Sequence, residues 1–194
     1  MKKLMIVCCM ILALALCAGA VADPVEVTGK VVLWETSAEE ADTQENQGTS
    51  KIRISFEPRS PVTLEELDTG DVFDDYICSI TREGVAPVIV AISGTDKEAH
   101  HNINNYSEED MKLYIDSQTS GMEEENYSTS IETSEAGNKY VVVEDAFSHS
   151  LVTIYDNYNI SVVQISANDD GTARSLTDAD RDFALEVFQG IWME

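Results

Sequence analysis

One stretch near the C-terminus, residues 126–192, constrains the fold more than any other part of the chain. Four short segments in it are rich in Val, Ile, Tyr and Thr, and Gly, Asn, Asp or Ser closes each of them. Apolar segments separated by turn residues are typical of successive β-strands joined as hairpins. The sequence therefore predicts a four-stranded meander made of Tyr127–Thr133, Lys139–Asp145, Leu151–Asp156 and Ile160–Ser166.

Three polar segments are expected to turn the chain between these strands. They are residues 135–138, 148–150 and 157–159, so that His149 is predicted to lie in the second turn. A helix over 177–192 should follow the meander. Thr177 is its predicted N-cap with Asp180 as the third helical residue, an arrangement that satisfies free amides of the first turn.

A second helix is predicted over 107–120. Ser107 and Asp110 have the spacing of a capping box, and Met111, Tyr114 and Ile115 share one face at helical spacing. Two of the predicted meander strands carry apolar side chains on both faces, so the sheet must be covered on both faces, or on one face with a partner on the other. We therefore predict an α+β fold, mainly an antiparallel sheet with a four-stranded C-terminal meander, covered by two helices.

The region before the second helix predicts further strands. Residues 51–56 alternate strictly between polar and apolar, and residues 76–81 and 85–92 form a predicted hairpin across residues 82–84. Thr63 and Glu66 have capping-box spacing, which predicts a turn or two of helix there.

The N-terminus has the pattern of a secretory signal peptide over residues 1–22. Lys2 and Lys3 precede an apolar run, and a small-x-small site ends at Ala22. The alternatives are an uncleaved anchor and a lipoprotein signal that uses Cys17. We expect residues 23–50 to form a strand-like arm and an acidic linker, and residues 51–194 to form a single α+β domain.

Charge excludes some partners and leaves others open. The chain carries 36 Asp and Glu residues against 12 Lys and Arg, for a net charge of −24. Nucleic acids and anionic membrane surfaces attract clustered Lys and Arg, so we expect neither as a partner, and no membrane contact beyond the signal peptide. A cation, a basic partner or solubility by self-repulsion remains open. We expect Cys78, the only cysteine after the signal, to be buried.

The order of the predicted elements resembles that of the PsbP-like α/β/α sandwich found in small exported proteins. Residues 140–145, 151–165 and 176–192 carry this resemblance. It implies a fold only, because no binding or catalytic motif of that family can be matched here residue by residue. Cystatin-like and other α+β sheets have the same pattern.

Candidate metal ligands are few and weakly patterned. His100 and His101 are adjacent, and neighbouring side chains diverge in both strands and helices, so one pair does not easily supply two ligands. The remaining candidates are acidic and would suit Ca²⁺ as a possible cofactor. They are Glu123, Glu124, Glu125, Asp169 and Asp170.

Two function hypotheses follow. The first is an exported, non-catalytic binding or interaction domain, secreted or held in the cell envelope, with an unidentified protein or envelope partner. The second is a secreted hydrolase or metal-dependent enzyme that uses His100, His101 or His149 with nearby carboxylates. Sequons at Asn105, Asn126 and Asn159 add possible glycosylation sites.

Overall fold

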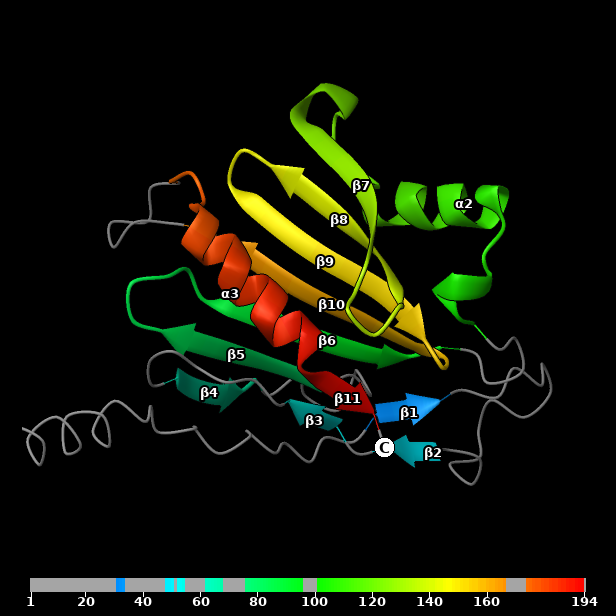
Figure 1. Ribbon diagram of the computed structural model, residues 1–194, viewed down its shortest axis with the longest axis horizontal. Coiled ribbons are helices and arrows are strands. Elements are labelled where there is room, and N and C mark those ends of the chain that lie inside the picture. The colour runs from blue at the N-terminus through cyan, green and yellow to red at the C-terminus, as the bar shows by residue number, and fades with distance from the viewer. Residues whose placement is uncertain are drawn as a thin grey trace, which may run out of the picture.

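The computed structural model describes residues 31–33, 48–50, 52–54, 62–67, 76–95, 101–166 and 174–193. Its centre is a seven-stranded sheet with the strand order β4-β5-β6-β10-β9-β8-β7 (Figure 1). The strands are β4 (Val62–Glu66), β5 (Tyr76–Arg82), β6 (Val88–Gly94), β7 (Tyr127–Thr133), β8 (Lys139–Asp145), β9 (Ser148–Tyr155) and β10 (Tyr158–Ile165). All neighbouring strands run antiparallel.

The four C-terminal strands of this sheet form the predicted meander. Strands β7, β8, β9 and β10 are consecutive in sequence and adjacent in the sheet. The α+β fold with a mainly antiparallel sheet is therefore confirmed. The predicted hairpin at residues 82–84 is confirmed as well, because β5 and β6 pair directly.

Two of the predicted turns were placed too late in the chain. Between β8 and β9 the chain turns at Ala146 and Phe147, where the Asp145 carboxylate accepts hydrogen bonds from the amides of Phe147 and Ser148. Between β9 and β10 it turns at Asp156 and Asn157, which have positive φ angles of 45° and 68°. A two-residue turn with this backbone matches the twist of paired strands. Because the chain has already turned at Ala146 and Phe147, His149 belongs to strand β9 and not to a turn.

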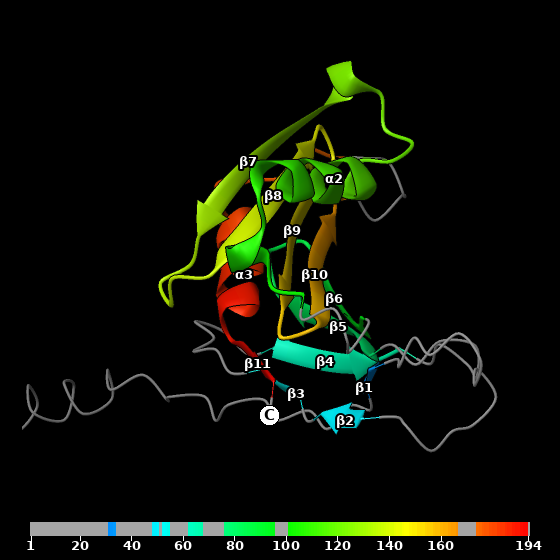
Figure 2. The ribbon, with the colours of Figure 1, turned by 90° about the vertical axis from the view of Figure 1, so that its right-hand side faces the viewer.

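Helix α3 (Asp178–Gln189) covers one face of the sheet (Figures 1 and 2). Thr177 and Asp180 form the predicted capping box at its start. Phe183, Ala184 and Val187 of this helix are at most 1% exposed and pack on side chains from β5, β6, β9 and β10. Burial of large apolar side chains here supplies the main driving force for folding.

Helix α2 (Glu108–Gln118) covers part of the opposite face. Ser107 and Asp110 form the predicted capping box, and Met111 and Tyr114 are buried against Val141, Val143, Val152 and Ile154. Because neighbouring side chains in a strand point to opposite faces, β8 and β9 supply both cores in alternation. A short 3₁₀ helix, η3 (Ile103–Asn105), precedes α2, and another, η4 (Glu124–Asn126), precedes β7.

Two predictions on local structure were wrong. Residues 62–66 form strand β4 and not a helical turn, because half-buried Val62 and Leu64 alternate with exposed neighbours and the segment pairs with β5. The C-terminal helix ends at Gln189 and not at Trp192. After Gly190 the chain forms β11 (Ile191–Met193), which pairs with β3 (Ile52–Ile54) in a small separate sheet.

The earliest described strands form a third sheet. Strand β1 (Val31–Leu33) pairs with β2 (Gly48–Ser50), and β1 lies close to β6. The predicted signal peptide, with Cys17, and most of the predicted arm and linker lie outside the described residues. Within the described part of the chain, no helix is long and apolar enough to cross a membrane.

The single cysteine of the described region, Cys78, lies in the core beneath α3. It is 0% exposed, so the prediction that it is buried is confirmed. Burial raises the pKa of its thiol to about 11. The thiol is therefore protonated at neutral pH and takes part in packing rather than in nucleophilic chemistry.

Candidate functional site

A groove runs along the flank of α3 that faces β7 and β8. Arg181, Leu185 and Phe188 of α3 line this groove, and their spacing of three to four residues places them on one stripe of the helix. The groove consists of two pockets. Tyr140 lines one pocket and Phe188 lines the other, and the centroids of their rings are 5.0 Å apart.

The first pocket, called here the histidine pocket, lies beside the N-terminal half of α3 and has a volume of about 500 Å³. Helix α3 packs mainly on β10, β9 and β6. The sheet therefore extends beyond the helix, and this uncovered part forms the floor of the pocket. Its lining residues are Ser128, Thr129, Ser130, Glu132, Tyr140, Val142, Glu144, His149, Leu151, Arg181, Asp182 and Leu185.

Glu144 is the central charged group of the histidine pocket. It pairs across the strands with Ser128 on β7 and with His149 on β9, so the three side chains share one face of the sheet. The guanidinium of Arg181 donates hydrogen bonds from Nε, at 2.8 Å, and from Nη2 to Oε1 of Glu144. The carboxylate is therefore already paired with a cation from α3.

His149 is enclosed on the inner side of this pair. Its side chain is 8% exposed, and its Nδ1 lies 3.7 Å from Oε2 of Glu144, too far for a hydrogen bond. Burial lowers the pKa of His149, the Glu144 charge opposes that shift, and the Arg181 charge adds to it. The imidazole is thus neutral at pH 7, and Nδ1 is buried without a hydrogen-bond partner in the described part of the chain.

The outer wall of the histidine pocket is polar and comes from β7. The Tyr140 hydroxyl donates a hydrogen bond of 3.0 Å to Oε2 of Glu132, and the Ser130 hydroxyl approaches Oε1 at 3.3 Å. Burial and the nearby Glu132 carboxylate raise the pKa of Tyr140 to about 12, so this hydroxyl remains a donor at neutral pH. These contacts fix the Glu132 carboxylate on the groove side of β7.

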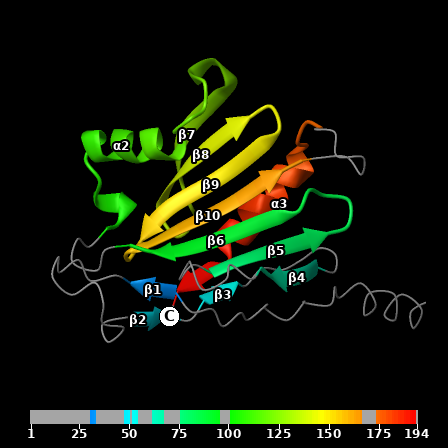
Figure 3. The same cartoon turned by 180° about the vertical axis from the view of Figure 1, so that it is seen from behind.

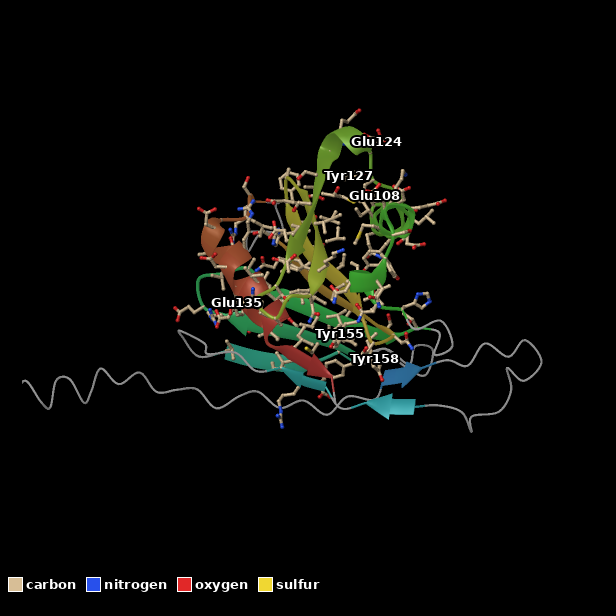
Figure 4. All side chains as sticks on the ribbon, turned by 45° about the vertical axis from the view of Figure 1, so that its right-hand side comes forward. Glu108, Glu124, Tyr127, Glu135, Tyr155 and Tyr158 are labelled. Carbon is tan, nitrogen blue, oxygen red and sulfur yellow. The ribbon has the colours of Figure 1, made fainter. Side chains whose placement is uncertain are left out.

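The second pocket, called here the aromatic pocket, lies beside the C-terminal end of α3 and has a volume of about 580 Å³. Glu135 of the turn between β7 and β8 and Tyr155 at the end of β9 line this pocket, and both are labelled in Figure 4. Its full lining is Ser134, Glu135, Ala136, Asn138, Lys139, Thr153, Tyr155, Asp156, Ile160, Phe188, Gln189 and Ile191. Apolar and aromatic side chains thus form its floor, and ionisable groups stand at its rim.

Carboxylates outnumber cations along the whole groove. The two pockets together contain five Asp or Glu side chains and only Arg181 and Lys139 as cations. Because Arg181 is paired with Glu144, the unpaired charge that the groove presents to a ligand is mostly negative. Such a groove attracts a ligand that is positively charged and partly apolar.

The predicted metal ligands that the structure describes do not lie together in one site. His101 is half-buried in a separate depression next to α2, together with Asp110. Glu123, Glu124 and Glu125 are exposed around η4, and Glu123 accepts a hydrogen bond from Asn126. Among the described residues no group of three or more potential ligands is arranged to hold a metal ion. His100, Asp169 and Asp170 lie outside those residues.

The predicted sequons differ in accessibility. Asn105 and Asn126 are exposed, whereas Asn159 is half-buried in β10. Its side-chain oxygen accepts a hydrogen bond from the Tyr114 hydroxyl at 3.0 Å. Asn159 is therefore engaged in the packing of α2 on the sheet, while the other two sequons remain open to modification.

Most of the groove was not predicted from the sequence. The sequence patterns give no signal for Glu132, Tyr140, Glu144 or Arg181, and they predict that His149 lies in a turn. One usable signal was Asp145, a residue type that commonly initiates turns by accepting bonds from the following amides. A turn centred just after Asp145 pairs Glu144 with His149, which brings the two ionisable groups together.

No protein-family model matches the chain, and none of the curated proteins searched matches it. The resemblance to the PsbP-like sandwich therefore stays a prediction.

Proposed function

We propose that this protein is an exported, non-catalytic binding domain that holds its ligand in the groove beside α3. The observation that carries the proposal is the continuation of two pockets along one flank of α3, one polar and one aromatic. Pockets of several hundred Å³ with an apolar floor and a few polar groups are the usual form of ligand sites.

The shape and charge of the groove favour an extended ligand. The lining residues of α3 run from Arg181 to Gln189, a rise of about 12 Å at 1.5 Å per residue. A peptide segment of three or four residues in extended form has that length. An apolar side chain would fill the aromatic pocket near Phe188, and a Lys or Arg would reach Glu132 or Asp182.

The surroundings of His149 give less support to the hydrolase or metal-dependent enzyme. The closest carboxylate is held by Arg181, and no hydrogen bond links Nδ1 of His149 to any described hydroxyl or thiol group. Nucleophilic catalysis needs a base within hydrogen-bond reach of its nucleophile. Cys78 lies in the core beneath α3 and cannot serve His149 in that role.

A selection from displayed random peptides tests the proposed function. The wild-type protein should enrich short peptides that combine basic and apolar residues, with affinities in the micromolar range typical of small grooves. Two variants fill the groove without disturbing buried side chains. Ser130→Trp obstructs the histidine pocket and Ala136→Trp obstructs the aromatic pocket, and both positions are exposed.

Thr133→Trp is the matched control because Thr133 is also exposed on β7 but lies outside both pockets. Peptides selected on the wild type should bind this control normally and bind the two groove variants at least about tenfold more weakly. Equal binding to all four proteins would contradict the proposal. So would hydrolysis of an ester or peptide substrate panel that is lost in His149→Gln.

A further inference from the structure

Strand β7 forms an open edge of the seven-stranded sheet (Figures 1 and 3). It pairs with β8 on one side over seven residues, from Tyr127 opposite Asp145 to Thr133 opposite Lys139, without interruption. No described strand pairs with its other side. Half of its backbone N–H and C=O groups therefore point away from the sheet, where another extended chain can bind them.

This edge carries only one of the features by which proteins usually prevent strand pairing, a single charged side chain. Protected edges are short, bulged, or carry Lys or Pro. The sequence of β7 is Tyr-Ser-Thr-Ser-Ile-Glu-Thr, and six of its seven residues are exposed. Its one charged side chain, Glu132, is held on the groove face by the Tyr140 hydroxyl. At the opposite edge, β4 has five residues and carries two exposed glutamates.

We propose that the free edge of β7 is an interaction surface that pairs with an extended segment of another protein, one with an uncharged, β-prone centre and Lys or Arg at its ends. Main-chain hydrogen bonds would supply the affinity, as in other cases of strand addition. The proposal goes beyond the groove beside α3, because the edge uses the backbone of β7 and the groove uses its side chains.

Acidic residues at both ends of β7 determine the chemistry of this partner. Exposed Glu123, Glu124 and Glu125 precede the strand, and exposed Glu135 follows it. Figure 4 shows Glu124 beyond one end of β7. Glu135 lies far from Glu124, toward the C-terminal end of α3. Basic residues that flank the added strand would lie next to these carboxylates, which favours association and accelerates it at low salt.

The same charges disfavour a second copy of this chain as the occupant. A two-fold axis through Ser130 would place the Glu123–Glu125 segment of each copy beside Glu135 of the other. Like charges so placed repel, and the net charge of −24 on each chain adds to the repulsion. A basic partner removes this cost and replaces it with attraction.

A designed peptide tests the proposal on the complete protein. The probe has seven alternating Thr and Val residues with two Lys at each end, and the matched peptide carries two Glu at each end. The Lys peptide should bind and slow amide hydrogen exchange within residues 127–133, while residues 62–66 at the opposite edge remain unchanged. The Glu peptide should bind at least about tenfold more weakly at low salt.

A double variant tests the contribution of the flanking charge. Glu124→Gln with Glu125→Gln should weaken binding of the Lys peptide by about three- to tenfold. Glu123 is left intact because it holds Asn126. The control, Glu65→Gln with Glu83→Gln, removes two exposed charges from the other end of the sheet and should leave binding unchanged.

Three outcomes would overturn the proposal. The first is binding of the Lys peptide without protection of β7, and the second is equal binding of the Lys and Glu peptides. The third is a homodimer, detected by sedimentation at several salt concentrations, whose β7 amides become protected as it forms. That last result would assign the edge to a second copy of the chain.

Discussion

Arg82 and Glu186 are 104 residues apart in sequence and form two parallel hydrogen bonds of 2.9 Å each across the α3 face of the sheet. The guanidinium of Arg82 also stacks on the Phe183 ring, 4.2 Å from its centroid. The Arg82 side chain is only 9% exposed, so water screens this pair weakly. The pair connects the end of β5 to the middle of α3.

Replacing Arg82 with Lys should destabilise the protein although the charge is kept. A lysine ammonium cannot make the two-bond fork to Glu186 or stack as a planar group on Phe183. We expect Arg82→Lys to lower the free energy of unfolding by about 1–2 kcal/mol in urea denaturation. Lys112→Ala removes an exposed ion pair with Asp116 and should have no measurable effect. Equal losses in the two variants would contradict this expectation.

Asp180 is a buried carboxylate that joins three parts of the chain. It is 0% exposed, and it accepts hydrogen bonds from the amides of Ala86 and Thr177 and from the Arg174 guanidinium. Burial alone would raise the pKa of Asp180, but the bonds from Arg174, Thr177 and Ala86 outweigh it and lower the pKa. The carboxylate thus fixes the start of α3 against the loop before β6.

Asp180→Asn should destabilise the protein by about 2–3 kcal/mol at pH 7, because an amide loses the charge-assisted bonds and leaves buried donors unmatched. Since the folded pKa is depressed, the stability contributed by Asp180 is present above the unfolded pKa near 3.8 and disappears as pH falls below it. Urea titrations at pH 7 and pH 3 should therefore differ less in the variant. Exposed Asp178→Asn is the control and should retain the wild-type pH dependence.

The overall fold could be predicted because local patterns and global packing agree. Apolar residues on both faces of Tyr140–Val143 required two covering layers, and α2 and α3 supply them on opposite faces. The capping boxes at Ser107 and Thr177 located the start of each helix. Each of these signals depends on residues close together in sequence, and the tertiary structure does not oppose it.

The groove could not be predicted because its parts are distant in sequence. Arg181 and Glu144 meet only because α3 packs across β6, β10 and β9, a result of side-chain packing that no local pattern specifies. The sequence predicts the turn before His149 too late in the chain because the three small or polar residues at 148–150 resemble a turn. Pairing of Glu144 with His149 across β8 and β9 extends the strand through those residues instead.

His149 should make stability depend on pH below about 6.5, because its pKa is lowered in the folded state. Burial lowers its pKa in the folded state, so the unfolded chain binds a proton first as pH falls below 6.5, and stability is lost through that range. Glu144, Glu132 and Arg181 face the imidazole, and the two carboxylates limit the size of the loss. His149→Gln should therefore lose less stability than the wild type between pH 7 and pH 5 in urea denaturation.

His101→Gln serves as the comparison for this experiment because His101 lies in a different depression next to α2. The wild-type pH dependence should persist in that variant. If His149→Gln and the wild type have the same pH dependence, the buried imidazole is not the group that titrates.

The acidic excess should make stability depend on salt. With 36 carboxylates against 12 Lys and Arg, the folded chain concentrates like charges that dissolved ions screen. The exposed Glu123–Glu125 segment does not converge with other described carboxylates into a metal site. The melting temperature should therefore rise with NaCl, and CaCl₂ at matched ionic strength should produce a similar rise.

A midpoint that increases at micromolar Ca²⁺ would show a specific site, because a ligand that binds only the folded state stabilises it in proportion to its occupancy. A midpoint that responds to neither salt would show that charge repulsion does not limit the stability of this fold.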